Sequence, residues 1–506
     1  MKKLKRVSKF VFIFILLLLT FINILLFFEI DWIIKNVGVV SFDEIIFHLK
    51  TPLKGTSTDM INDNLFKCLL PTIIIYVLFI LLLFFKKSFY TIININIFNK
   101  YKLIRLKKLV MFLLLIINLI ILFLHFKSFD DKFKIIDYIK MQSQSSLFIE
   151  ENYVDPRDVK LTFPDKKRNL IYIYLESIES NYMDKENGGN LDNNIIPELT
   201  ELAKDNINFS DTESLGGAYP MTGTGWTAGA MVSHSSGIPL KIPINGNAYT
   251  GYGKFLPGIY NIGDILSDNG YNQEIVFGSD SNFGGRKTYF ETHGNTIIKD
   301  LYTAREEGII PEDYYNYWGF EDSILFEYSK KELEELSKKE EPFSFNILTV
   351  NTHFPDGYTE DSCTKEYDND YMNAIKCSSK QVMEFVDWIK AQDFYDNTTV
   401  VVVGDHLTMS QNEIVSGISY YNRRIYNAFI NSPIDTSYNK NRKFCSLDFF
   451  PTTLASLGVS IEGNKLGLGT NLFSDEKTLI EEYDFTYVNN ELSKKSNYYD
   501  NNFLYK

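Results

Sequence analysis

The sequence predicts an α/β protein in which an N-terminal anchor of three membrane-spanning helices precedes an α/β sandwich with a mainly parallel central sheet. Three apolar runs, at residues 10–28, 68–85 and 109–126, each approach the roughly 20 residues that cross a bilayer core. From residue 169 onward, short and continuously apolar segments alternate with helical ones. Strands of that kind are buried on both faces, which is typical of a parallel sheet covered by helices.

The basic residues indicate how the anchor is oriented. Five Lys or Arg residues lie within residues 2–9, before the first run, and seven lie within residues 86–108, between the second and third. Under the positive-inside rule both segments face the cytoplasm. The sequence therefore predicts a multi-pass protein of the cell (inner or plasma) membrane whose chain after residue 126 is extracytoplasmic.

Three regions follow from these patterns: the anchor at 1–126, a juxtamembrane connector at 127–168 and an outer domain at 169–506. Apolar residues at helical spacing near the start of the connector predict a helix on the membrane surface. Residues 1–126 carry 16 basic and 6 acidic side chains, whereas the rest of the chain carries 35 and 58. Because nucleic acid binding draws mainly on Lys and Arg, this acidic balance argues against nucleic acid as a partner.

The outer domain is expected to carry its chemistry at one edge of the sheet, since ligands of parallel sheets bind beyond the carboxyl ends of the strands. Strands are predicted at 169–177, 207–214, 271–279, 343–353 and 397–406, and helices at 195–205, 259–270 and 378–392. Four strands end in polar groups: Glu176, Ser279 with Asp280, Thr352 with His353, and Asp405 with His406. Any one of them alone is more simply a cap of its own strand or of the next helix. Together, carboxylates and an imidazole at one point suit a divalent metal.

A nucleophile is expected in the Gly-, Ser- and Thr-rich run at 216–240, which is typical of a loop that enters a helix. Its threonines Thr222, Thr224 and Thr227 are candidates for the N-cap. The first turn of a helix presents free N–H groups that favour a phosphate. A threonine there is often only a cap, but one that also binds a metal becomes a nucleophile.

These residues resemble the membrane-anchored phosphoglycerol transferases of the sulfatase / alkaline-phosphatase superfamily. The matching pieces are "IYLES", "GTGWTAGAMVS", "FETHG", "TVNTHFPDG", "GDHLTM" and "LDFFPTTLASLGV", in the order of that family and within about residues 169–472. The resemblance implies an alkaline-phosphatase/sulfatase-like catalytic domain at 169–506. The Cys-x-Pro-x-Arg signature of sulfatases is absent from the sequence, which argues against sulfate ester hydrolysis.

The resemblance also implies the site residues. Glu176, Thr227, Asp405 and His406 match the ligands of a single metal, and Thr227 matches the nucleophile. Thr227 is favoured over Thr224 because the threonine of the family follows a glycine by two positions, as Thr227 follows Gly225.

Three further residues are implied as contacts of the substrate. His353 matches an active-site histidine with catalytic and substrate-binding roles, and Arg286 falls where the family has a basic residue for the phosphoglycerol group. His293 lies in a matching piece, although a role at the end of a helix is the simpler interpretation. His234 is expected to pack or hydrogen-bond within a helix, and Trp226 either shields the site or lies in the core.

The activity that this resemblance implies is transfer of sn-glycerol 1-phosphate from phosphatidylglycerol to a cell-envelope polysaccharide or glucan, through a glycerophosphoryl-Thr intermediate. One divalent metal is expected, Mn²⁺ or Mg²⁺, with Zn²⁺ less favoured. The alternatives are a polymerase of the lipoteichoic acid synthase type, a phosphodiesterase that uses water, and a non-enzymatic sensor. Cys363 and Cys377 either form a disulfide in an oxidising compartment or remain free thiols.

Overall fold

The computed structural model describes residues 2–36, 41–51, 55, 58–85, 93–97, 100–104, 106–242, 253–410, 414–415 and 417–504. Contacts divide the chain into two units, which are described separately. The first comprises residues 1–39 and 57–136, and the second comprises residues 40–56 and 137–506. The boundaries expected at residues 126 and 168 stay predictions.

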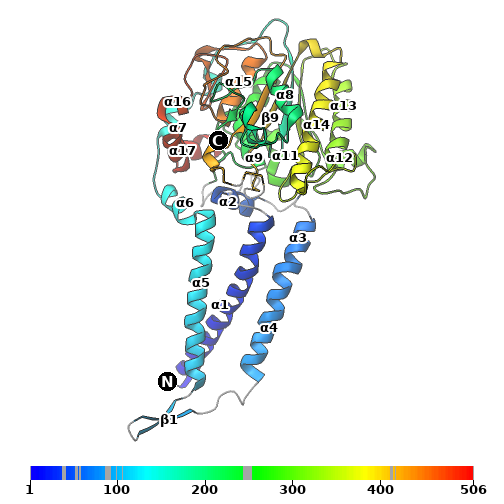
Figure 1. Cartoon of the computed structure of the whole chain (residues 1–506). Coiled ribbons are helices and arrows are strands. Elements are labelled where there is room, and N and C mark those ends of the chain that lie inside the picture. The colour runs from blue at the N-terminus through cyan, green and yellow to red at the C-terminus, as the bar shows by residue number, and fades with distance from the viewer. Residues whose placement is uncertain are drawn as a thin grey trace. The chain divides into compact units, whose positions relative to one another are not determined.

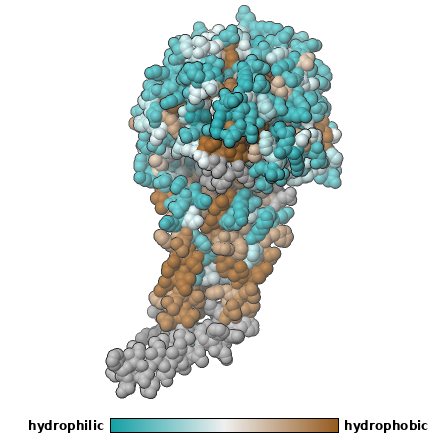
Figure 2. Space-filling view, viewed as in Figure 1, coloured by the Kyte–Doolittle hydropathy of each residue, from teal (hydrophilic) through white to brown (hydrophobic). Residues whose placement is uncertain are grey.

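The first unit contains three helices long and apolar enough to cross a membrane, as the apolar runs predict. Their candidate spans are Arg6–Asn36, Met60–Leu82 and Leu109–Phe133. The spans belong to α1 (Lys2–Asn36), to α3 (Thr58–Asn64) with its continuation through α4 (Leu70–Phe85), and to α5 (Leu106–Phe133). Figure 1 shows these helices side by side, and their side chains in Figure 2 are largely hydrophobic.

A buried polar contact joins two of the spans: Nδ2 of Asn23 in α1 donates to the carbonyl and side-chain oxygens of Asn118 in α5, at 2.9 Å each. Side-chain amides often link helices in this way within a bilayer. Of the basic connection between the second and third spans, Lys86, Lys87 and Arg105 lie outside the described residues.

The second unit is built on a seven-stranded sheet with the order β5-β10-β9-β4-β8-β6-β7. The strands from β9 to β7 run parallel, and β10 is antiparallel to both β9 and β5. The strands are β4 (Asn169–Leu175), β5 (Gly217–Ala218), β6 (Asn272–Phe277), β7 (Ile297–Lys299), β8 (Phe343–Leu348), β9 (Thr398–Gly404) and β10 (Ile425–Ile430). This sheet confirms the predicted fold class.

Helices cover both faces of the sheet (Figure 1). They include α8 (Pro197–Asp205), α9 (Thr227–Ser236), α10 (Ile262–Asp268), α11 (Arg286–Thr292), α12 (Leu301–Glu306), α13 (Asp322–Leu336), α14 (Asp370–Lys390), α15 (Phe449–Ser456), α16 (Leu479–Tyr483) and α17 (Phe485–Ser493). Three shorter helices precede the sheet in the chain: α2 (Phe42–Lys50), α6 (Ile135–Gln142), which begins in the first unit, and α7 (Phe148–Asn152).

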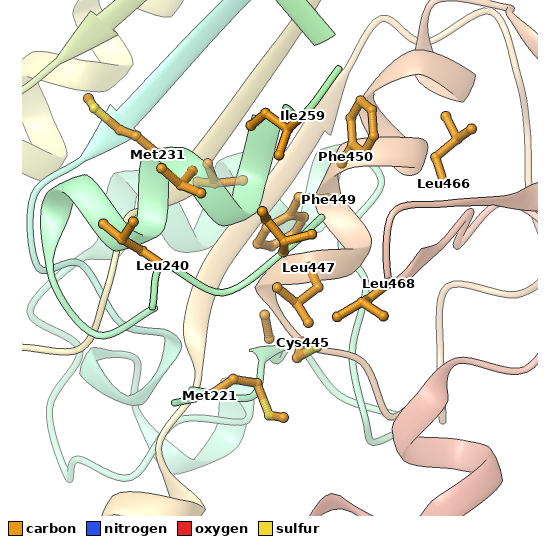
Figure 3. Packing of buried hydrophobic residues seen from close by; sticks show 14 of the residues in the cluster. Met221, Met231, Leu240, Ile259, Cys445, Leu447, Phe449, Phe450, Leu466 and Leu468 are labelled. Atoms are coloured by element: carbon orange, nitrogen blue, oxygen red, sulfur yellow. The ribbon is translucent and has the colours of Figure 1, made fainter. Parts of the chain in front are cut away.

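Alternate residues of each central strand enter different cores, because successive side chains of a strand point to opposite faces. Tyr172 and Tyr174 of β4 join the core that includes α9 and α15, whereas Ile171 and Ile173 join the core that includes α8, α13 and α14. Figure 3 shows the first core, in which side chains from α9 and α15 gather with those of neighbouring loops. This packing fixes α9 against the sheet.

The expected strands at 207–214 and 343–353 differ from the structure. The second ends at Leu348, before Thr352 and His353. The strand expected at 207–214 is reduced to an isolated bridge between Ile207 and Phe429. The side chains of Asn208 and Asn427 instead hydrogen-bond to the neighbouring backbone, which replaces a regular ladder. The strands β5, β7 and β10 of the sheet, in contrast, are not among the predicted strands.

The structure contains a disulfide between Cys363 and Cys377, with the Cα atoms 5.6 Å apart. It joins the loop that follows β8 to α14. Replacing both cysteines with serine is expected to lower the free energy of unfolding of this unit by about 3 kcal/mol, because the bond closes a loop across a sequence separation of 14. Thermal unfolding of the full chain would measure this, and reductant should lower the melting temperature of the wild type but not that of the double variant.

Candidate metal centre and active site

The adjacent parallel strands β4 and β9 bring two carboxylates together. Leu175 pairs with Gly404 at the carboxyl ends of these strands, so Glu176 and Asp405 follow at the same level. A Cβ atom on Gly404 would lie 2.0 Å from the carbonyl oxygen of Ile178, so only glycine permits this approach. The strand ends therefore fix the separation of the two acids.

Glu176, Asp405 and His406 form one buried group whose ligand atoms all lie within 4.8 Å of one another. Nε2 of His406 lies 3.5 Å from Oε1 of Glu176 and 3.4 Å from Oδ2 of Asp405. Such a group could hold a metal ion, and the predicted convergence of these three residues is present in the structure.

Hydrogen bonds orient each of these groups toward a common point. Nδ1 of His406 lies 2.9 Å from the carbonyl oxygen of Leu407, an arrangement in which Nδ1–H donates and Nε2 keeps its lone pair for a metal. Oδ1 of Asp405 accepts from the backbone N–H groups of Ser177 and His406. Oδ2 of Asp405 is buried and has no hydrogen-bond partner among the described residues. A buried carboxylate oxygen left in this state fits a cation.

The charges of the group lead to the same conclusion. Burial and the neighbouring Glu176 raise the pKa of Asp405 to about 7. Burial would raise the pKa of Glu176 too, but the imidazoles of His406 and His353 lower it. Burial opposes the charged form of His406, yet Asp405 and Glu176 raise its pKa to about 9. A divalent cation would supply the positive charge that lets all three residues act as deprotonated ligands.

Thr227 begins α9 directly beside this group. Its Oγ1 lies 3.2 Å from Oε2 of Glu176 and 3.4 Å from Nε2 of His406. The N-cap is Trp226, so Thr227 is the first helical residue rather than the cap that the loop pattern suggested. Thr224 instead bonds within its own loop, where its hydroxyl contacts the backbone of Met221.

Two of the predicted substrate contacts, His353 and Arg286, interact electrostatically with Glu176 of this group. Burial lowers the pKa of both, to about 10 for Arg286, although the carboxylate of Glu176 favours the charged form of each. Nδ1 of His353 lies 2.8 Å from the carbonyl oxygen of Phe354. Nη2 of Arg286 donates to the hydroxyl of Ser279 and to the carbonyl oxygen of Asp280.

His293 and His234 have local partners. His293 follows the last residue of α11, and its two ring nitrogens lie 2.8 Å from Oδ2 of Asp264 and 3.0 Å from the carbonyl oxygen of Phe255. These contacts agree with a role at the end of a helix, and the substrate role of His293 stays a prediction. His234 is buried, with Nδ1 3.2 Å from the hydroxyl of Tyr172.

Sequence reasoning missed a contribution from the segment between the first two apolar helices. The helix α2 belongs to the second unit, and its residues Glu44 and Phe47 are buried. The available signal was the pattern "SFDEIIFHLK", in which Ser41 caps a short helix with acidic residues in its first turn. Nothing in that pattern states where the helix docks.

A threonine at a helix start beside a group that could hold a metal, at the carboxyl edge of a parallel sheet, is the arrangement of an α/β enzyme site. Residues 168–459, more than half of the chain, match the family model described as Sulfatase. The chain therefore belongs to the sulfatase family.

The chain is also similar in sequence to individual curated proteins. Phosphoglycerol transferase I of Escherichia coli (strain 55989 / EAEC) is 37% identical over 257 residues, which cover 49% of this chain and 32% of the relative. Phosphoglycerol transferase I of Shigella boydii serotype 18 matches to the same extent, 37% over 257 residues. The match thus spans about a third of the length of these curated relatives.

Two solved structures share the fold. The lipoteichoic acid synthase of Listeria monocytogenes aligns with a TM-score of 0.50 and 19% identity, covering 65% of this chain and 81% of that one. The integral membrane protein lipooligosaccharide phosphoethanolamine transferase A of Neisseria meningitidis aligns with a TM-score of 0.50 and 14% identity, covering 88% and 83%. At these identities the likeness concerns the fold alone.

Proposed function

We propose that this protein transfers a phosphoglycerol group from phosphatidylglycerol to a cell-envelope polysaccharide or glucan. The observation that carries the proposal is Oγ1 of Thr227, held 3.2 Å from Glu176 and 3.4 Å from His406 at the start of a helix. The 37% identity to phosphoglycerol transferase I supports the choice of the transferred group. A membrane anchor suits a lipid donor, since enzyme and donor then share one membrane.

In the first step the hydroxyl oxygen of Thr227 attacks the phosphorus of the donor. A Thr–O–P bond forms, the bond from phosphorus to the diacylglycerol oxygen breaks, and diacylglycerol leaves with a proton. A divalent ion held by Glu176, Asp405 and His406 would lower the pKa of the attacking hydroxyl and neutralise phosphoryl charge. The N–H groups in the first turn of α9 favour the same anion.

In the second step a hydroxyl of the acceptor attacks the glycerophosphoryl group on Thr227. Its oxygen bonds to phosphorus, the Thr–O–P bond breaks, and the oxygen of Thr227 regains a proton. His353 is the acid and base in both steps, with Nδ1 held by a carbonyl oxygen and Nε2 left for the substrate. Arg286 would contact the phosphoglycerol group through Nη1 and its positive charge, because its Nε and Nη2 donate to Phe283, Ser279 and Asp280 and hold the guanidinium in place.

Product analysis tests this function. The full chain in detergent, with Mn²⁺ and phosphatidylglycerol labelled in its headgroup, is expected to release diacylglycerol and pass the label to an added glucan. Phosphatidylethanolamine as donor should give little product. Label that appears only as free glycerol phosphate would indicate a hydrolase, and label in chains of glycerol phosphate a polymerase. An absence of diacylglycerol under all conditions would contradict the proposal.

Removal of the metal is expected to destabilise the second unit. An ion at 100 times its dissociation constant stabilises the folded state by about 2.7 kcal/mol, and its loss also leaves Glu176 and Asp405 facing each other. Thermal unfolding with and without a chelator would measure this shift, and elemental analysis would show whether Mn²⁺, Mg²⁺ or Zn²⁺ is bound. His406→Ala is the control, because its melting temperature should no longer respond to the chelator.

A further inference from the structure

The helix α2 lies in sequence between the first two apolar helices, yet it is packed into the core of the second unit. Phe47 is completely buried there, and its ring centroid lies 5.7 Å from that of Trp226. Trp226 directly precedes Thr227. The hydroxyl of Thr222, in the same loop, contacts Oδ2 of Asp43 at 3.3 Å. One side of α2 therefore rests against the segment that presents the nucleophile.

The helix α2 also contacts the loop at residues 279–285, which leads into Arg286 at the start of α11. The imidazole of His48 stacks on the ring of Phe283, with centroids 5.5 Å apart and planes inclined by 24°. A Cβ atom on Gly284 would lie 3.7 Å from both the ring of Phe47 and the methyl of Ala228. Gly284 therefore lies within packing distance of both Phe47 in α2 and Ala228 in α9.

The polar residues of α2 interact electrostatically with residues of the candidate site. Glu44 is buried and interacts electrostatically with His406 and Glu176. Nε2 of His48 lies 3.9 Å from Oε1 of Glu44, one helical turn away, and the side chain of His48 keeps 36% of its exposure. Burial, with some repulsion from His353, lowers the pKa of His48. The imidazole carries an N–H donor in its neutral form as well as in its charged form.

We propose that His48 is a substrate-contacting residue that donates a hydrogen bond to the phosphoglycerol group, on the side of the site where Arg286 and His353 lie. This inference rests on the proposed function. Phe47 alone would serve the packing of this helix. The imidazole of His48, in contrast, is stacked on Phe283 close to Arg286 and keeps 36% of its exposure, which suits contact with a ligand. The segment between the first two apolar helices would thereby take part in donor recognition.

The test uses the full chain in detergent with Mn²⁺ and measures the dissociation constant of sn-glycerol 1-phosphate by calorimetry. His48→Ala is expected to weaken binding about tenfold, as loss of one hydrogen bond to a charged group does. His48→Gln keeps an N–H donor and should stay within about threefold of the wild type. Leu49→Ala is the matched control, because Leu49 is the neighbouring residue of α2 and is 76% exposed.

The outcomes separate this inference from the proposed function. Equal binding by the wild type and His48→Ala would overturn the inference, as would equal losses in His48→Ala and Leu49→Ala or no binding of the probe by the wild type. Selective loss in His48→Ala, with rescue by His48→Gln, would establish the contact. If the wild type binds the probe but releases no diacylglycerol from phosphatidylglycerol, the proposed function fails while the contact stands.

Discussion

Thr227→Ala is expected to abolish the covalent intermediate and to lower phosphoglycerol transfer by about 10³-fold or more. The reason is geometric, since Oγ1 of Thr227 is the hydroxyl that lies 3.2 Å from Glu176 and 3.4 Å from His406. Without it the phosphorus has no protein nucleophile. Mass spectrometry of the full chain, incubated with phosphatidylglycerol and Mn²⁺ but no acceptor, should show a glycerophosphoryl adduct on Thr227 of the wild type.

Two variants make this experiment decisive. Thr227→Ser retains a hydroxyl at the start of α9 and should still form the adduct, although more slowly, because the methyl that orients the threonine is lost. Thr224→Ser retains the hydroxyl that contacts the backbone of Met221 and should react like the wild type. An adduct on Thr224, or undiminished transfer by Thr227→Ala, would remove Thr227 as the nucleophile.

The features that could be predicted from the sequence are those determined by the local pattern of apolar residues. The apolar runs specify three long helices, and the apolar segments at 169–175 and 398–404 predict strands, which pair in parallel in the structure. Once those strands are adjacent, Glu176 and Asp405 must meet, because both directly follow the paired ends. The three metal-type residues were therefore accessible to reasoning from sequence and from family resemblance.

The unpredictable part depends on contacts between distant segments. The position of α2 is decided by the fit of Phe47 against Trp226 and Gly284, which no local pattern encodes. The strand β10 was equally difficult to predict from the sequence, because it follows a long loop and pairs with β9 in the antiparallel direction. The start of α9 was displaced by one residue, since the cap is Trp226 and not a threonine. Helix boundaries of this kind depend on backbone geometry rather than on residue type.

A buried ion pair next to the candidate site gives the second large effect. Glu179 and Arg423 are at most 1% exposed, and Nε of Arg423 donates to Oε2 of Glu179 at 2.8 Å. Both residues also hold Thr408, whose N–H donates to Glu179 and whose carbonyl oxygen accepts from Arg423. Thr408 lies two residues after His406, so the pair anchors the loop that carries this ligand.

Glu179→Gln is expected to lower the free energy of unfolding of the second unit by roughly 3–5 kcal/mol, because it leaves the charge of Arg423 buried without a counter-charge. The double variant Glu179→Gln with Arg423→Met removes that charge and should recover much of the loss. Asp192→Asn is the matched control: it breaks the exposed pair with Lys185 and should leave the melting temperature unchanged. Thermal unfolding of the full chain gives the comparison.

If the single variant were as stable as the wild type, Arg423 would have to reach another counter-charge or water, and the loop after His406 would not depend on this pair. The affinity for the metal should change in parallel with stability, and Glu179→Gln should bind the metal more weakly than the double variant or the wild type. The reason is that the loop that loses its anchor is the one that presents His406.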